Sequence, residues 1–379
     1  MGESLVTWAF PTTVVFGVGA VTKVAEQVQR VGGKRALVVC DGGVVRAGIA
    51  DRVRALLEAG GVEAAIFDAV DPNPVEKNVM DGAAAYRAHD ASCIVAVGGG
   101  SPLDTGKLIG LRVTHERPLA DYDDAIDGGR WIGPTVPPVV TIPTTAGTGS
   151  EVGRSGVVTL AATGRKTVIF SPHLLAKVAL LDPELTRSLP ARITAATGFD
   201  ALTHALEAFC SLGDHPMADA IALGGLELCA SHLTRAVESG DDLRARGGMM
   251  KAAMMGAVAF QKGLGACHSL AHPLSSVKGL HHGLANAICL PAVVEFNEPA
   301  VHERLERIRR LLDPSAPTCA HAVRNLRGRV GLPEGLRTEG VGEADLPKLS
   351  DHAFEDACHR CNPRPTTRDD LASLYRASL

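Results

Sequence analysis

Aspartate and histidine residues in the second half of the chain have the spacing of a metal site. Asp200 and His204 lie four residues apart, and on a helix this spacing places both side chains on one face. The neighbouring residues are alanine, leucine and phenylalanine, so we expect that face to be buried. A buried carboxylate and imidazole need a partner. A divalent cation is one such partner, and a mutual Asp–His hydrogen bond is the alternative.

Three further histidines follow within a short stretch of sequence. His268 and His272 repeat the spacing of four residues, and His282 comes shortly after them. One carboxylate with two or three imidazoles, and no thiolate, is a usual ligand set for a first-row metal such as Fe(II) or Zn(II), with one position left for substrate. Glu207 is expected to be polar helix surface, with a supporting contact to the metal site as the alternative.

Two segments of the first half, rich in glycine and hydroxyl groups, could hold a nucleotide. Residues 98–101 read Gly-Gly-Gly-Ser and lie between a predicted strand and a predicted helix. Glycines there let the backbone approach a ligand, and the N-terminus of the helix attracts an anion such as a pyrophosphate. Residues 143–152 carry three threonines, a serine and two glycines after another predicted strand. A tight turn and a solvated linker, respectively, are the alternatives.

Asp41 stands directly after a predicted strand, before Gly42 and Gly43. In nucleotide-binding folds an acidic residue at a strand end can accept the ribose hydroxyls of NAD, and it would repel the additional phosphate of NADP. A turn-forming aspartate before two glycines explains the same residue without any ligand. Both interpretations remain open from the sequence.

The elements that must position these residues differ between the two halves. Up to Pro183, short β-branched runs such as 35–40, 92–97 and 138–142 alternate with helical patterns. Continuous apolar strands alternating with helices indicate a mostly parallel sheet that is covered on both faces. This part of the chain is therefore predicted to be an α/β domain.

After Pro183 the strand patterns fade, and long alanine- and leucine-rich helical patterns cover 191–210, 217–239 and 243–262. We therefore expect two domains. Residues 1–183 would form the α/β dinucleotide-binding domain, and residues 184–379 an all-helical domain that carries the metal.

Composition excludes several classes of function. The 379 residues include 38 lysines and arginines against 42 aspartates and glutamates, a near balance that argues against nucleic acid as a partner. No uninterrupted apolar run reaches the roughly 18 residues of a membrane span. Residues 1–4 lack the basic region of a secretory signal, so we expect a cytoplasmic protein with reduced cysteines. Cys358 and Cys361 form a single C-x-x-C pair, which we interpret as incidental, with a redox-active pair or half of a zinc site as the alternatives.

The motifs taken together resemble those of the iron-dependent (group III) alcohol dehydrogenases, within the dehydroquinate synthase-like superfamily. The resemblance spans nearly the whole chain, and it is carried by the segments 98–104, 143–151, 198–204 and 268–286. It implies an α/β domain that binds NAD(P), an all-helical domain that carries the metal, and a metal in the cleft between them.

The resemblance also implies roles for individual residues. Those that match the four metal ligands are Asp200, His204, His268 and His282. His272 matches a histidine beside the nicotinamide that is often assigned to proton relay. The positions that match cofactor contacts, with Asp41 linked to a preference for NAD, are Asp41, Gly98, Gly99, Gly100, Ser101, Asp104, Thr144, Thr145, Thr148 and Lys166.

The function that this resemblance implies is reversible hydride transfer between NAD(H) and a small primary alcohol or diol and its aldehyde. Fe(II) is the implied metal and Zn(II) the alternative, and NAD(H) is favoured over NADP(H). The alternative function keeps the fold and acts on a polyol or a phosphorylated substrate, as in glycerol dehydrogenase or dehydroquinate synthase. A nucleotide-binding sensor without turnover is a further alternative. A homodimer or larger homo-oligomer is also implied.

Overall fold

The computed structural model describes residues 12–379 of the chain. Residues 1–4, from which the absence of a secretory signal was inferred, lie outside the described residues. The chain forms two compact units. The α/β unit comprises residues 12–145 and 150–188, and the helical unit comprises residues 146–149 and 189–379.

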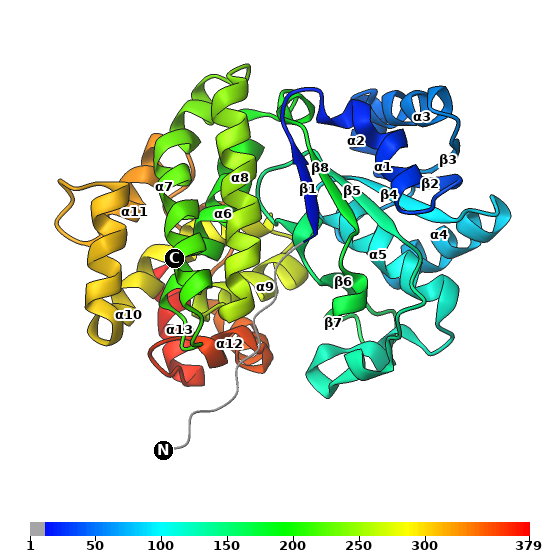
Figure 1. The fold of residues 1–379 in the computed structure, drawn as a ribbon. Coiled ribbons are helices and arrows are strands. Elements are labelled where there is room, and N and C mark those ends of the chain that lie inside the picture. The colour runs from blue at the N-terminus through cyan, green and yellow to red at the C-terminus, as the bar shows by residue number, and fades with distance from the viewer. Residues whose placement is uncertain (1–11) are drawn as a thin grey trace. The chain divides into compact units, whose positions relative to one another are not determined.

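The α/β unit is built on one parallel sheet of six strands (Figure 1). Its strands are β1 (Thr13–Phe16), β2 (Arg35–Val39), β3 (Glu63–Phe67), β4 (Cys93–Gly98), β5 (Val139–Pro143) and β8 (Val178–Leu181). Their order across the sheet is β1-β8-β5-β4-β2-β3, and every neighbouring pair is parallel. The predicted parallel sheet is therefore confirmed. The patterns above missed β1, a short edge strand that is only partly buried.

Alternate residues of β2, β4 and β5 pack into separate apolar clusters on the two faces of the sheet. In β4, Val95 and Val97 pack with residues of α1 (Val24–Arg30) and α3 (Ile49–Ala59). Ile94 belongs to the cluster that contains residues of α4 (Glu76–Ala88) and α5 (Gly100–Thr114). Because strand side chains alternate between faces, helices cover both sides of the sheet, as predicted.

Two local features differ from the simplest expectation. The segment after Asp41 forms two helices, α2 (Gly42–Arg46) and α3, because Gly48 between them has a φ of +72°, outside the range of a right-handed helix. The strands β6 (Ser155–Thr159) and β7 (Lys166–Phe170) form an antiparallel pair of their own and do not join the large sheet.

The helical unit confirms the predicted change from strands to long helices after Pro183. Its helices are α6 (Ala191–Cys210), α7 (Pro216–Glu238), α8 (Leu243–Ala259), α9 (Ala266–Lys278), α10 (His282–Leu312), α11 (Cys319–Arg329), α12 (Leu346–Glu355) and α13 (Arg368–Ala377). Among residues 12–379, no helix combines the length and the apolar character needed to cross a bilayer.

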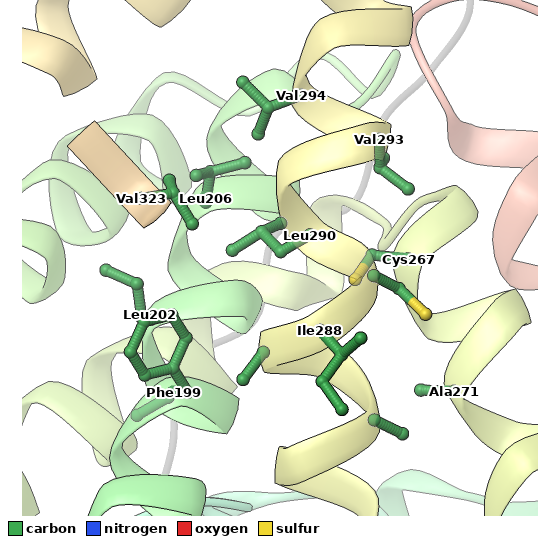
Figure 2. Packing of buried hydrophobic residues seen from close by; sticks show 14 of the residues in the cluster. Phe199, Leu202, Leu206, Cys267, Ala271, Ile288, Leu290, Val293, Val294 and Val323 are labelled. Atoms are coloured by element: carbon green, nitrogen blue, oxygen red, sulfur yellow. The ribbon is translucent and has the colours of Figure 1, made fainter. Parts of the chain in front are cut away.

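Helix α6 lies in the core of this unit, since every residue from Thr194 to Cys210 is buried. Figure 2 shows apolar side chains of α6, α9, α10 and α11 meeting around the first turns of α10. A helix buried on all sides places its few polar side chains in the interior, where each requires a partner. The polar residues of α6 therefore mark the place to look for chemistry.

Candidate active site

The four predicted metal ligands converge within the helical unit. Asp200 and His204 project from α6, His268 from α9, and His282 from the start of α10. The Oδ1 atom of Asp200 lies 3.9 Å from Nε2 of His204, 3.9 Å from Nε2 of His268 and 3.5 Å from Nε2 of His282. The first of these distances is too long for the mutual Asp–His hydrogen bond that was the alternative. One carboxylate oxygen thus faces three imidazole nitrogens.

Close helix packing brings these side chains together. A Cβ atom on Gly283, at the start of α10, would overlap the carbonyl oxygen of Ala196 on α6. A Cβ atom on Gly256, in α8, would lie only 3.0 Å from Cβ of His204. Any larger residue at Gly283 would push the start of α10, and with it His282, away from Asp200.

Glu207 is part of this site, so the expectation that it forms polar helix surface is wrong. Its side chain is buried, and Oε2 accepts a hydrogen bond of 2.6 Å from Nδ1 of His268. Its other oxygen accepts the backbone N–H of Cys267 at 2.7 Å, in the first turn of α9. Glu207 lies seven residues after Asp200, hence on the same helix face, and this spacing could have revealed it.

The donor set fits a divalent metal. Burial lowers the pKa of His204 to about 4, so this ring is neutral at ordinary pH. His268 donates Nδ1–H to Glu207, which directs its Nε2 towards Asp200. Donor atoms that share one ion at bonds of about 2.1 Å lie roughly 3.4 Å apart in a tetrahedral site. The separations around Asp200 are 3.5 and 3.9 Å, and the ligand atoms of Asp200, His204 and His268 all lie within 4.8 Å of one another.

Within residues 12–379, the side chain that donates a hydrogen bond to the Asp200 carboxylate is Asn286. It lies one turn after His282 on α10, is fully buried, and donates Nδ2–H to Oδ1 of Asp200 at 2.8 Å. This bond orients the carboxylate towards the histidines. No role was predicted for Asn286, although its spacing of four residues from His282 is the same signal that identified the other pairs.

His272 lies beside the ligand group. Its ring stacks on that of His282 with 5.2 Å between centroids, and its side chain is 28% exposed. Nδ1 of His272 contacts Oδ2 of Asp356 at 2.8 Å. Asp356 lies 84 positions further along the chain, and no sequence pattern pointed to it. His272 thus has a carboxylate partner at one ring nitrogen and partial access to solvent.

In the α/β unit, three candidate segments meet at one edge of the sheet. β4 lies between β2 and β5, and all three strands run parallel, so their carboxyl ends are adjacent. Asp41 follows β2, Gly98 ends β4, and Thr144 follows β5. The backbone N–H of Thr144 donates to the carbonyl oxygen of Gly98 at 2.9 Å. The chain turns in opposite directions after β2 and β4, and doubly wound sheets bind nucleotides at such a point.

The segment 98–101 has the backbone of an anion site. Gly98 has a φ of +144°, and a Cβ atom there would lie 2.7 Å from Cγ of Pro102, so only glycine fits. Gly99 precedes α5 and makes no side-chain cap, which leaves the first N–H groups of the helix without a side-chain acceptor. The hydroxyl of Ser101 donates to the carbonyl oxygen of Pro72.

Asp41 caps the helix that follows it. Its Oδ1 atom accepts the backbone N–H groups of Gly43 at 2.7 Å and Val44 at 3.0 Å. This is the structural role that the turn interpretation anticipated, and a contact of the same carboxylate with a ribose stays a prediction.

Two other predicted cofactor residues have defined surroundings. Asp104 accepts the hydroxyl of Ser150 at 2.5 Å and the backbone N–H of Val157 at 3.2 Å, so both of its oxygens are engaged within the unit. Lys166 begins β7 opposite Thr159.

The second glycine-rich segment is divided between the units. Thr144 and Thr145 belong to the α/β unit, and a Cβ atom on Gly99 would lie 3.3 Å from the Thr145 side chain. Residues 146–149, which include Thr148, belong to the helical unit. A Cβ atom on Gly147 would lie 2.9 Å from Thr197 of α6. Close packing on a helix therefore accounts for that glycine.

Two protein-family models together match nearly the whole chain. A family model described as iron-containing alcohol dehydrogenase matches residues 11–183, and one described as the C-terminal region of the Fe-containing alcohol dehydrogenase family matches residues 194–379. The chain is 43% identical to a 4-hydroxybutyrate dehydrogenase of Cupriavidus necator, over 95% of this chain and 96% of that protein.

Solved structures agree with these matches. A crystal structure of 1,3-propanediol oxidoreductase has a TM-score of 0.95 at 38% identity, covering 99% of this chain and 100% of that one. A sulfoacetaldehyde reductase of Bifidobacterium kashiwanohense, solved in complex with NAD+, has a TM-score of 0.89 at 30% identity, with 99% of each chain covered.

Proposed function

The chain belongs to the iron-containing alcohol dehydrogenase family, and from this premise we propose that it interconverts a small primary alcohol or diol and its aldehyde, with NAD as the hydride carrier. The observation that carries this proposal is the convergence of one carboxylate and three imidazoles in the buried part of the helical unit. Metal and NAD use agree with relatives that are described as iron-containing and as bound to NAD+.

Asp200, His204, His268 and His282 are the proposed metal ligands. Fe(II) is the metal we favour from the family, with Zn(II) as the alternative that the same donor set accepts. A divalent metal supplies Lewis-acid stabilisation of the substrate oxygen when it is bound there. Glu207 holds the His268 ring by its Nδ1–H, and Asn286 holds the Asp200 carboxylate, so both ligands are oriented before any metal arrives.

His272 is the proposed catalytic base and acid. Its Nδ1 atom is engaged by Asp356, which leaves Nε2 as the atom that would accept the alcohol proton during oxidation and return it during aldehyde reduction. Its partial exposure gives the proton a route to solvent. The ring stands beside His282 without belonging to the group of four proposed ligands.

The nucleotide would bind at the carboxyl edge of the parallel sheet. The N–H groups at the start of α5 and the backbone of Gly98, Gly99 and Gly100 suit a pyrophosphate. Ser101, Thr144, Thr145, Thr148 and Lys166 remain proposed cofactor neighbours. Asp104, whose oxygens bond to Ser150 and to the backbone of β6, would act by supporting this edge. The carboxylate of Asp41 favours NAD over NADP by charge.

The activity is tested by NADH formation with metal-free protein that is reloaded with Fe(II), Zn(II) or Mg(II). The substrates are 1,3-propanediol, 4-hydroxybutyrate, ethanol, glycerol and glycerol 3-phosphate. We expect turnover of the diol or the primary alcohols that depends on Fe(II) or Zn(II) and is absent with Mg(II). Turnover of glycerol or its phosphate alone would favour the alternative substrate class, and turnover without metal would refute the proposal.

Cofactor preference is tested by Asp41→Asn. Asparagine keeps an oxygen for capping α2 but removes the charge, so stability should be retained while NADP becomes a usable cofactor. The ratio of kcat/KM values for the two cofactors is the measurement. An unchanged ratio would remove Asp41 from this role.

Compartment and assembly belong to the same proposal. We place the protein in the cytoplasm, which is supported by nine free cysteines, all within residues 12–379. We also expect a homodimer or larger homo-oligomer. Light scattering coupled to size-exclusion chromatography measures this, and a monomer would contradict it.

A further inference from the structure

A carboxylate outside the four proposed ligands contacts the proposed base. Oδ2 of Asp356, in the segment after α12, lies 2.8 Å from Nδ1 of His272 on α9. Both side chains are partly buried, with 22% of Asp356 and 28% of His272 exposed. A pair of this kind recurs in enzymes where a carboxylate orients a histidine base.

The Asp356 carboxylate is itself held in place by two donors. Its Oδ1 atom accepts the hydroxyl of Ser269 at 2.8 Å and the backbone N–H of Cys358 at 2.8 Å. The Ser269 oxygen accepts the backbone N–H of His359, also at 2.8 Å, so its hydrogen is directed to Asp356. With Oδ1 engaged twice, Oδ2 is the oxygen that faces His272.

This arrangement determines where the His272 ring carries its proton. Burial acts to raise the pKa of Asp356, but the nearby His272 and the bonds from Cys358 and Ser269 outweigh it and hold that pKa well below its usual range. An ionised carboxylate only accepts hydrogen bonds, so the contact requires a proton on Nδ1. Among residues 12–379, no hydrogen-bond partner is found for Nε2 of His272, so in the neutral ring its lone pair is available.

We propose that Asp356 is a positioning residue that fixes His272 in the Nδ1–H tautomer and so presents Nε2 as the proton acceptor. The proposal rests on the proposed function, in which His272 relays the proton of the alcohol. It adds a residue from a different segment, 84 positions along the chain, and it makes the backbone turn after α12 part of the catalytic apparatus.

A second metal site is the other interpretation of this cluster, because ligand-type atoms of His272, Asp356 and Cys358 all lie within 4.8 Å of one another. One observation favours the positioning role: both Asp356 oxygens already accept hydrogen bonds from groups of the chain.

Asp356→Asn is the decisive variant because the two donors at Oδ1 predict how its amide will turn. Ser269 and Cys358 would hold the amide oxygen, and the NH2 group would then face Nδ1 of His272. That nitrogen would have to accept, which moves the ring proton to Nε2 and blocks it as a base. We expect kcat to fall about 100- to 10,000-fold, with substrate KM and metal content unchanged.

The tautomer is read directly in the metal-free protein by NMR with 15N-labelled histidine. The His272 resonances are assigned by their loss in His272→Ala. Wild-type protein should show the Nδ1–H pattern at His272, and Asp356→Asn the Nε2–H pattern. An unchanged pattern would overturn the proposal. This measurement involves no turnover, so its result stands apart from the test of the proposed function in the wild-type assay.

A double-mutant cycle separates positioning from general damage. In the His272→Ala background, Asp356→Asn should change kcat by less than about twofold, because both substitutions impair the same proton transfer. A full additional loss in that background would show that Asp356 acts elsewhere. Asp351→Asn is the matched control: it removes an exposed carboxylate of α12 that pairs with Arg368, and it should leave kcat unchanged.

A milder variant is available if Asp356→Asn lowers the unfolding midpoint. Ser269→Ala removes one of the two donors that aim the carboxylate, and Asp356→Glu keeps an acceptor on a longer side chain. Both should fold and lower kcat several-fold at unchanged KM, with the Nδ1–H pattern retained. A loss of metal from either variant would instead support the second metal site and contradict the positioning role.

Discussion

Two clusters of buried polar side chains, one from each unit, are built on opposite principles. In the helical unit, Asp200 and Glu207 face the rings of His204 and His268, and this group includes no lysine or arginine. In the α/β unit, the fully buried ammonium of Lys107 donates to the hydroxyl of Ser150 and the carbonyl of Ser155, both at 2.8 Å.

The cluster around Lys107 is matched within the chain. Asp104 lies 3.5 Å from its ammonium and accepts the Ser150 hydroxyl as well, and the buried Glu151 is a further charge near it. Such a cluster binds its own elements together, here α5 with the start of β6. It offers little to a ligand, because its groups already have partners.

In the cluster around Asp200, one carboxylate oxygen faces three imidazole nitrogens, with the amide of Asn286 beside them. Taking carboxylates and imidazoles out of water costs free energy that their contacts with Asn286 and with one another offset only in part. The proposed cation would complete that site. The comparison teaches that a buried polar cluster is a candidate ligand site when its charges remain unmatched within the chain. Burial and charge alone, which both clusters share, are insufficient.

Among the changes that test this difference between the two clusters, removal of the Asp200 carboxylate should have the largest effect. We expect Asp200→Ala to lose bound metal entirely and with it turnover, a loss well above the roughly 10- to 100-fold that a supporting hydrogen bond contributes. Elemental analysis of the purified protein measures it. Asp104→Asn, the carboxylate of the matched cluster, should keep its metal. Full metal occupancy in Asp200→Ala would contradict the ligand assignment.

Removal of the buried cation should damage the other unit without affecting the metal. Lys107→Met leaves Asp104 and Glu151 without their counter-charge, and we expect unfolding to become easier by roughly 3–5 kcal/mol. Urea denaturation of the metal-free protein measures this. Lys77→Met, which breaks an exposed pair with Asp81, should cost no more than about 0.5 kcal/mol. Equal losses of unfolding free energy in the two variants would contradict the role of the Lys107 ammonium in balancing the buried carboxylates.

Glu151 gives the α/β cluster a predicted pH dependence. Burial raises the pKa of this carboxyl from 4.5 to about 7, so between these values the folded protein binds a proton that the unfolded chain has released. Stability therefore falls as pH rises through that window, by about 3 kcal/mol in total, and is constant above it. Glu151→Gln should remove this slope when unfolding of metal-free protein is compared from pH 4.5 to 8.

The smallest expected effect is on metal affinity when the hydrogen bond from His268 to Glu207 is removed. Glu207→Gln can still accept the N–H of Cys267, but one amide group cannot also accept Nδ1–H of His268. We expect metal affinity to fall roughly 10- to 100-fold, measured by competition with a chelator. Glu227→Gln, an exposed change on α7, is the control. An unchanged affinity would show that His268 is oriented by packing alone.

Local patterns predicted well whatever depends on one element. The parallel sheet and the three long helices follow from strand and helix periodicity. The spacing of four residues correctly indicated that Asp200 and His204 share a buried face. Patterns failed where two elements had to be known together. Glu207 shares that face, yet its importance depends on His268, which lies 61 positions away on another helix.

Asp356 shows the same limit more strongly. Nothing in its neighbourhood of sequence indicates a contact with His272, because the hydrogen bond exists only when the segment after α12 packs beside α9.

The sequence by itself determined which carboxylate and imidazole side chains share a helix face. It also determined the division into an α/β half and a helical half, and the family to which the chain belongs. Only the tertiary structure decided that three helices bring one carboxylate oxygen within 3.9 Å of three imidazoles. It also decided that Glu207 contacts His268, that Asn286 contacts Asp200, and that Asp356 contacts the neighbouring His272. The physical reason is that the spacing of residues along an element sets the direction of a side chain. Its partner is set by how closely elements pack, as at Gly283 against Ala196.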